Sequence, residues 1–140
     1  PDHKSQINIL RDRHSENPLD RVQPVVTKDE LLQLIQEARA VEANDRIFDY
    51  ITTLAEATRT HPMVELGVSP RGALALCRMA KAHAFLAGRD FVVPEDVAAV
   101  FPDVCAHRLI LSAKARMMEE KAENILAEIL RSVDMPVLKA

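Results

Sequence analysis

One arginine of this sequence stands where a cation is unfavourable unless an anion lies nearby. Ser69-Pro70 is a helix-start signal, because the serine hydroxyl can accept from first-turn amides and proline fits the first helical position. Arg71 follows directly, so it belongs to the first turn, where the helix dipole is positive. A bound phosphate would balance that charge, since guanidinium groups bind phosphate oxygens bidentately. A salt bridge within the fold or a guanidinium that reaches into solvent would also account for Arg71, and these interpretations stay open.

Other chemistry has little support in the sequence. There is no G-x-x-x-x-G-K-[ST] phosphate loop and no apolar strand that ends in paired acids to hold magnesium, so the chain alone is not expected to hydrolyse ATP. The five histidines form no H-x-x-x-H pair, and Cys105-Ala106-His107 is too short for a metal motif, so we expect no metal site. No nucleophile–base pair or carboxylate cluster favours a free-standing enzyme.

Periodic apolar residues and capping signals predict helices that position Arg71. We expect helices near residues 2–15, 28–41, 45–60, 70–87 and 94–101, an irregular or short helical piece at 109–111, and a last helix within 112–133. Thr27 and Glu30 have capping-box spacing, and Gly88 is predicted to end the helix that Ser69 begins. Pro102 is predicted to close the helix that Pro94 begins. Residues 17–26 and 61–68 are expected to be connectors.

Composition limits the fold and the surroundings. Three glycines and 4% aromatic residues among 140 favour an all-α fold, and we expect a small bundle of about five or six helices in one domain, residues 1–140. The net charge of −3 gives no general attraction to nucleic acid or anionic lipid, and no apolar run is long enough to span a membrane. Two isolated cysteines predict a reducing, cytoplasmic setting. Because the chain begins at Pro1 without methionine, we expect a piece of a longer protein.

Several motifs in order resemble the C-terminal lid of MoxR-type AAA+ ATPases. The resemblance covers residues 1–111, and it leaves 112–140 as an amphipathic tail helix. The motifs are Pro1-Asp2, Ile9-Leu10, Tyr50-Ile51, Ala57-Thr58-Arg59, His61-Pro62, Gly67-Val68-Ser69-Pro70-Arg71, Gly88 to Val97, and His107-Arg108-Leu109. Two residues depart from the pattern of the resembled family: Val93 stands in place of a capping threonine, and Gly72 stands in place of alanine. The glycine weakens its helix by up to about 1 kcal/mol.

The resemblance implies a function for a larger protein. Arg71 would be the sensor-2 arginine, contacting the terminal phosphates of ATP bound with Mg²⁺ by a separate core domain, in cis or in trans, with Ser69 and Pro70 beside the nucleotide. No cofactor is expected to bind tightly to this chain alone. The lid would couple ATP binding and hydrolysis to assembly of a hexameric ring and to chaperone-like remodelling. Its partners would be its own core domain, neighbouring subunits and proteins with von Willebrand factor A domains.

A different class of function remains as the alternative. The chain would then be a stand-alone helical module that binds protein or nucleic acid. The acidic balance and the lack of a basic stripe disfavour nucleic acid. The tail, residues 112–133, has its own two interpretations, a helix that completes the core or a helix that binds a partner.

Overall fold

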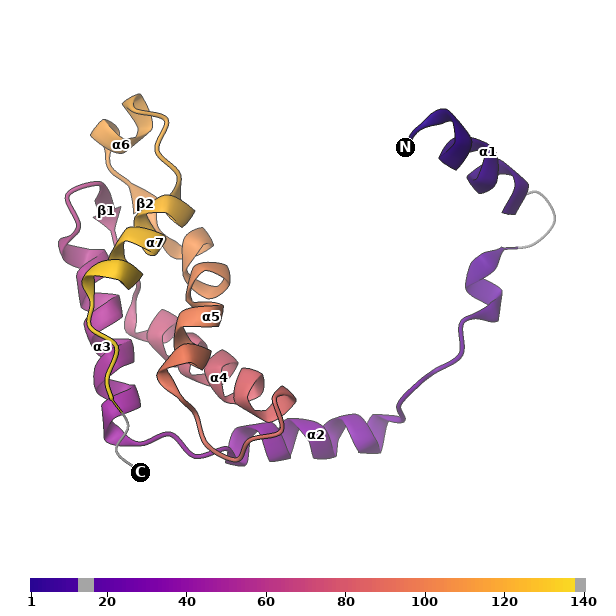
Figure 1. Ribbon diagram of the computed structural model, residues 1–140, viewed down its shortest axis with the longest axis horizontal. Helices are drawn as coiled ribbons and strands as arrows, with labels where there is room; N and C mark the ends of the chain where they lie inside the picture. Colours follow the sequence, from indigo (N-terminus) through magenta and orange to yellow (C-terminus); the bar gives the residue numbers. More distant parts are fainter. Residues whose placement is uncertain (13–16, 138–140) are drawn as a thin grey trace. The chain divides into compact units, whose positions relative to one another are not determined.

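A computed structural model describes residues 1–12 and 17–137 of the chain (Figure 1). By contacts, the chain divides into two compact units, Pro1–Gln33 and Leu34–Ala140. We describe each unit by itself. The prediction of one continuous lid domain over residues 1–140 stays a prediction.

Unit 1 contains short helical segments with well-defined starts. Helix α1 spans His3–Asp12, and a single 3₁₀ turn, η1, spans Pro18–Arg21 within the predicted connector. The predicted end of the first helix, residues 13–15, lies outside the described residues. Helix α2, Lys28–Ala40, crosses into unit 2 and begins with the predicted capping box. The N–H of Thr27 donates to a Glu30 carboxylate oxygen at 2.7 Å, and the Glu30 N–H donates to Thr27 Oγ1 at 3.2 Å.

Unit 2 is a helical bundle with its own core. Its main helices are α3 (Asp45–Thr60), α4 (Pro70–Leu86), α5 (Pro94–Cys105) and α7 (Ala122–Ser132), with α4 and α5 in extensive contact. Their apolar residues recur at helical spacing, so each helix buries one face. The largest fully buried apolar side chains are Phe101, Ile47, Leu54, Leu76, Ile125, Leu126, Ile129, Val68 and Val97. The seven α-helices of the described residues confirm the predicted all-α fold.

A two-stranded antiparallel sheet was not predicted. Strand β1, Val64–Leu66, falls in a predicted loop, and strand β2, Ile110–Leu111, falls in a predicted helical or irregular piece. The register pairs Val64 with Leu111 and Leu66 with Ile110. Strands of two or three residues are too short to show alternation in a sequence. The short helix α6, Ala113–Met117, follows this sheet at one end of unit 2 (Figure 1).

Two predicted helix boundaries were wrong. Pro102 does not close α5, which continues to Cys105 with Pro102 inside it. An interior proline costs about 3 kcal/mol in a helix, but burial of Val104 and Cys105 in the following turn offsets that cost. The predicted tail helix is two helices, α6 and α7, because Glu119 adopts a left-handed conformation with φ of 55° and ends the first one. Helix α7 then packs Ile125, Leu126 and Ile129 into the core, so the core-completing interpretation of the tail is confirmed.

Candidate functional site

Arg71 lies in the first turn of α4, as the sequence predicts. Ser69 is the N-cap residue, and its Oγ accepts from the Gly72 N–H at 3.2 Å, while Pro70 is the first helical residue. The Arg71 side chain is exposed, and no hydrogen bond or ion pair joins it to any other residue that the structure describes. The two interpretations that survive are a solvent-facing arginine and a contact with a partner. Ser69 already uses its hydroxyl as a cap, and a contact of Ser69 or Pro70 with a nucleotide stays a prediction.

The segment just before α4 is fixed by the end of α3. Val68 is fully buried, and both of its backbone polar groups are bonded to side chains of α3. Its N–H donates to Thr58 Oγ1 at 2.8 Å, and its carbonyl accepts from Arg59 Nε at 2.8 Å. Gly67 allows this approach, because a Cβ there would lie 2.6 Å from the backbone nitrogen of Arg59. The direction in which α4 begins, and therefore the place of Arg71, is set by α3.

Arg108 reaches the same turn from the other side. It lies in the 3₁₀ turn η2, Ala106–Arg108, which follows α5. Its Nη1 donates to the Val104 carbonyl at 2.8 Å and also contacts Nε2 of His107. A Cβ at position 72 would lie 3.2 Å from Arg108 Cδ and 2.7 Å from Val68 Cγ1. Glycine at 72 therefore weakens the helix locally but makes room for two neighbours, which accounts for this departure from the resembled pattern.

The first turn of α4 is strongly positive. Arg71 lies in this turn, Arg59 binds the Val68 carbonyl just before it, and the Arg108 stem packs beside Gly72, at an end that already carries the partial positive charge of the helix dipole. None of the three guanidinium groups has a carboxylate within 4.0 Å among the described residues. Positive charges near a helix N-terminus that have no counterion raise the local potential and favour an anion. Chemically, this surface is suited to binding phosphate oxygens.

A groove lies along the same helix. It has a volume of about 780 Å³ and is lined by the second half of α2, the first turn of α3 and the middle of α4. Leu74 and Arg78 line it and follow Arg71 at spacings of three and seven residues, so all three residues share one face of α4. The lining combines apolar and basic side chains without an acidic one: Ile35, Ala38, Arg39, Phe48, Leu74, Cys77, Arg78, Lys81 and Ala82.

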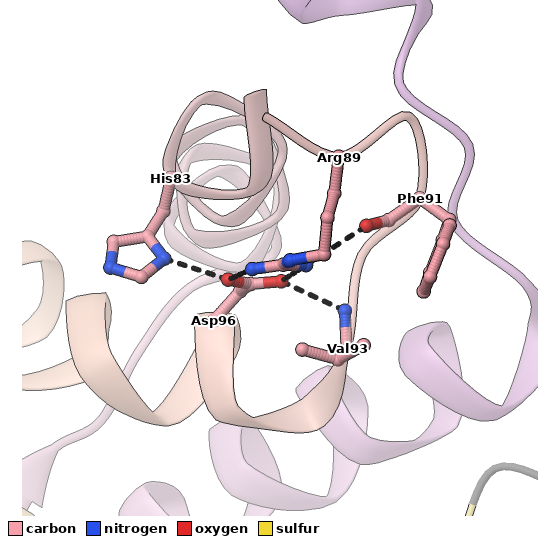
Figure 2. A network of polar contacts seen from close by, with 5 residues as sticks. All are labelled: His83, Arg89, Phe91, Val93 and Asp96. Carbon is pink, nitrogen blue, oxygen red and sulfur yellow. Dashed lines mark hydrogen bonds and ion pairs between the residues drawn. The ribbon is translucent and has the colours of Figure 1, made fainter. Parts of the chain in front are cut away.

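A second polar centre joins the far end of α4 to the start of α5 (Figure 2). Asp96 is 1% exposed and receives two bonds from Arg89, with Nη1 at 2.7 Å from Oδ2 and Nη2 at 2.5 Å from Oδ1. The Val93 N–H donates to Oδ2 at 2.8 Å, and His83 Nδ1 lies 2.7 Å from Oδ1. Val93 supplies no capping group of its own, so Asp96 caps this helix alone.

The pKa of Asp96 shows the balance of forces in this network. Burial raises the pKa of the carboxyl, but the bonds from Arg89, the Val93 amide and His83 outweigh it and hold the pKa at about 2. Every partner of Asp96 belongs to the fold, and the Arg89 side chain also donates to the Phe91 carbonyl at 3.1 Å. The cluster is a structural brace between α4 and α5.

Sequence reasoning identified Arg71 and missed most of its supports. Arg89 forms a salt bridge with Asp96, whereas Arg59 binds a backbone carbonyl. The signal for Asp96 was present, since Val97, Val100 and Phe101 follow it at spacings of one, four and five and place it on the buried face of α5. Thr58 and Arg108 stand in motifs of the resemblance, but no periodicity indicated that Thr58 binds Val68 or that Arg108 packs beside Gly72.

The described residues hold neither a metal-binding cluster nor a membrane-spanning helix. Nowhere in residues 1–12 and 17–137 do three His, Cys, Asp or Glu side chains gather in a way that could hold a metal ion. Within the same ranges, no helix has the length and hydrophobicity needed to cross a membrane.

Comparisons with known proteins agree with this architecture. Residues 56–129 match the AAA lid domain family. The whole chain is 36% identical to YeaC of Bacillus subtilis, covering 44% of that protein. Over 83% of the chain, it is 31% identical to the chaperone MoxR1 of Mycobacterium tuberculosis, covering 33% of that protein.

A solved structure has a similar fold. The crystal structure of a proposed ATPase from Cytophaga hutchinsonii superposes on 97% of the chain with a TM-score of 0.84 and 32% identity. The chain covers 44% of that structure. It therefore spans less than half the length of each of these relatives.

Proposed function

This chain belongs to the AAA lid domain family, as the lid of a MoxR-type AAA+ ATPase, and from that premise we propose that Arg71 contacts the terminal phosphates of ATP bound to a core domain. The core domain would supply the phosphate loop and the magnesium site. Arg71 would stabilise negative charge on the transferring phosphoryl group, in the role of a sensor-2 arginine.

The observation that supports the proposal is the unpaired charge of Arg71. The side chain is exposed at the positive end of α4, two further arginines contact the neighbouring Val68 and Gly72, and no described carboxylate lies within 4.0 Å of Arg71. This arrangement is electrostatically unfavourable by itself, and a polyphosphate would relieve it. The loop bonds of Thr58 and Arg59 to Val68 support a precise placement of the first turn, which electrostatic catalysis requires.

We extend the proposal to the whole protein. Nucleotide state would set the position of the lid, and the lid would help to build a hexameric ring that remodels other proteins. The chaperone name of the Mycobacterium tuberculosis relative supports a remodelling role. The apolar and basic face of α4 that adjoins Arg71 is suited to contact the core domain or a neighbouring subunit.

Proteins with von Willebrand factor A domains are the proposed partners. Free thiols at Cys77 and Cys105 support a cytoplasmic location.

The test of this function is ATP turnover by the intact parent protein with Arg71→Ala. We expect kcat to fall at least tenfold at matched oligomeric state, which corresponds to about 1.4 kcal/mol of lost transition-state stabilisation. Arg131→Ala is the control, since Arg131 is an exposed arginine in the last turn of α7. Unchanged turnover of the Arg71 variant would leave Arg71 without a role in hydrolysis.

The isolated chain should be folded but bind ATP weakly. Most phosphate and magnesium contacts would belong to the core domain, so calorimetry on the 140-residue chain should give a Kd well above the micromolar range. Circular dichroism in the same buffer provides the control for folding. Micromolar binding by this chain alone would mean that it carries a complete nucleotide site, contrary to the proposal.

A further inference from the structure

We propose that Arg108 is a positioning residue for Arg71, holding the first turn of α4 in the orientation that hydrolysis needs. The inference rests on the proposed function of Arg71 and adds a second residue, from another element, to the same site. Arg108 acts through the helix turn that carries Arg71 and has no assigned contact with nucleotide.

The first step of the argument is the packing of the Arg108 stem on Gly72. A Cβ at position 72 would lie 3.2 Å from Arg108 Cδ and 3.7 Å from Nε. The stem therefore lies against the place that a side chain at position 72 would take, next to Val68 Cγ1 at 2.7 Å. A rotation of the first turn that carries Gly72 toward the stem is blocked by it, and such a rotation would also redirect Arg71.

The second step is the anchoring of the guanidinium at the other end of the same side chain. Arg108 Nη1 donates to the Val104 carbonyl at 2.8 Å, in the last turn of α5, and contacts Nε2 of His107. Val104 is 7% exposed and Cys105 is fully buried, so the end of α5 is part of the core. One side chain thus ties the core to the turn that carries Arg71.

The third step is the charge. Arg108 adds a cation near the positive end of α4 and has no carboxylate within 4.0 Å among the described residues. The bond to the Val104 carbonyl gives this guanidinium a structural role at the end of α5, and a bound anion would offset the positive charge that it adds. The proposal depends on the fixed stem, which holds the turn from which Arg71 must meet that anion at a defined position.

The test is a double-mutant cycle on ATP turnover by the intact parent protein. The variants are Arg71→Ala, Arg108→Ala and both together, with kcat and KM measured for each. If Arg108 acts through Arg71, Arg108→Ala lowers kcat three- to tenfold in the presence of Arg71 and has almost no effect once Arg71 is alanine. Arg108→Lys should keep most of the activity, because lysine retains the stem and a donor for Val104.

Controls separate this role from a structural one. Arg46→Ala removes another arginine that donates to a backbone carbonyl, Val137, at 2.7 Å, and it should leave kcat unchanged. A merely structural loss would lower turnover by the same factor with Arg71 or with alanine at position 71, and that additive result would overturn the inference. If Arg108→Ala does not fold, Arg108→Met replaces it in the cycle, since methionine keeps the apolar stem without the guanidinium.

The outcomes distinguish the two proposals. If Arg71→Ala lowers kcat tenfold and Arg108→Ala does not lower it, the positioning role is wrong and the function of Arg71 stands. If Arg71→Ala leaves turnover unchanged, the proposed function fails and the positioning role fails with it.

Discussion

Asp96 is the buried polar side chain that links His83 of α4 and Arg89 to the start of α5. It is almost completely buried, and its charge is neutralised by Arg89 and by the neighbouring bonds from His83 and the Val93 amide (Figure 2). A buried carboxylate with this many donors stabilises the fold only while it is ionised. The stability of unit 2 should therefore depend on pH through this one group.

We expect Asp96→Asn to lower the free energy of unfolding at pH 7 by about 2 kcal/mol, from the shift of pKa between 3.8 and about 2. Because the folded pKa is lowered, the contribution is complete above about pH 4 and is lost as the pH falls towards 2. The stability of the variant should therefore fall less steeply than that of the wild type between pH 4 and pH 2. Urea denaturation across this range measures both effects.

The control for this prediction is Asp103→Asn, which changes an exposed acid of the same helix. It should alter stability by less than about 0.5 kcal/mol, as expected for a surface position. If the unfolding free energy of Asp96→Asn fell as steeply with pH as that of the wild type, the pKa of Asp96 would not differ between the folded and unfolded states, contrary to the prediction.

At the residue scale, the sequence identified what lies near in the chain. Ser69 and Arg71 were predicted because capping and the helix dipole act within one turn. Thr58 lies ten residues from Val68, and Arg108 packs beside the much more distant Gly72, so helical periodicity does not show these contacts even though both residues belong to motifs of the resemblance. The glycine at 72 was interpreted as a weakness, whereas the structure shows two side chains in the space beside it.

The link from α3 to α4 is the element-scale feature that places the candidate site. Thr58 Oγ1 donates to the Ala55 carbonyl at 2.6 Å and accepts from the Val68 N–H, so one buried hydroxyl joins a helix to the following loop. Valine has nearly the same shape but neither donates nor accepts. Thr58→Val would leave the buried Val68 amide without a partner.

We expect Thr58→Val to cost about 1–3 kcal/mol, the penalty for an unsatisfied buried polar group. The matched control is Thr52→Val, because Thr52 Oγ1 donates to the Phe48 carbonyl at 2.8 Å but is exposed and accepts from no described loop amide. Denaturation in urea gives the stability, and hydrogen exchange of the Val68 amide should become faster in the Thr58 variant alone. Equal losses in the two variants would assign the effect to the threonine-to-valine change itself and not to the link.

Elements with strong start signals were predictable, and those decided by packing were not. Asn44, Ser69 and Thr27 each cap a helix where the sequence predicts a start or a break. The continuation of α5 through Pro102 depends on burial of the residues beyond it, and the short strands depend on each other. The helix and strand propensities of single residues contribute less free energy than such tertiary contacts, so they do not decide these elements.

At the scale of the whole molecule, unit 2 contains the complete core. In residues 1–12 and 17–137, the buried apolar side chains all lie between Val41 and Ile129, and neither α1 nor α2 contributes a buried residue. The sequence therefore predicts the class of fold from composition, but it does not reveal that the amphipathic pattern of residues 28–41 leaves its leucines exposed. Leu31, Leu32 and Leu34 are 48%, 46% and 40% exposed.

Removal of residues 1–26 should therefore leave the stability of unit 2 nearly unchanged. The remaining chain begins at Thr27 and keeps the cap of α2 and every buried side chain, so we expect the melting temperature to stay within about 3 °C, less than the shift that 1 kcal/mol produces in a domain near 100 residues. Truncation before Ala122 is the contrasting variant. It removes Ile125, Leu126 and Ile129, each worth about 1.5–3 kcal/mol when buried, against a total stability of about 5–15 kcal/mol. Calorimetry should show a cooperative transition for the first variant and none for the second. A large destabilisation by the first truncation would mean that residues 1–26 contribute to the fold through interactions other than the burial of core side chains.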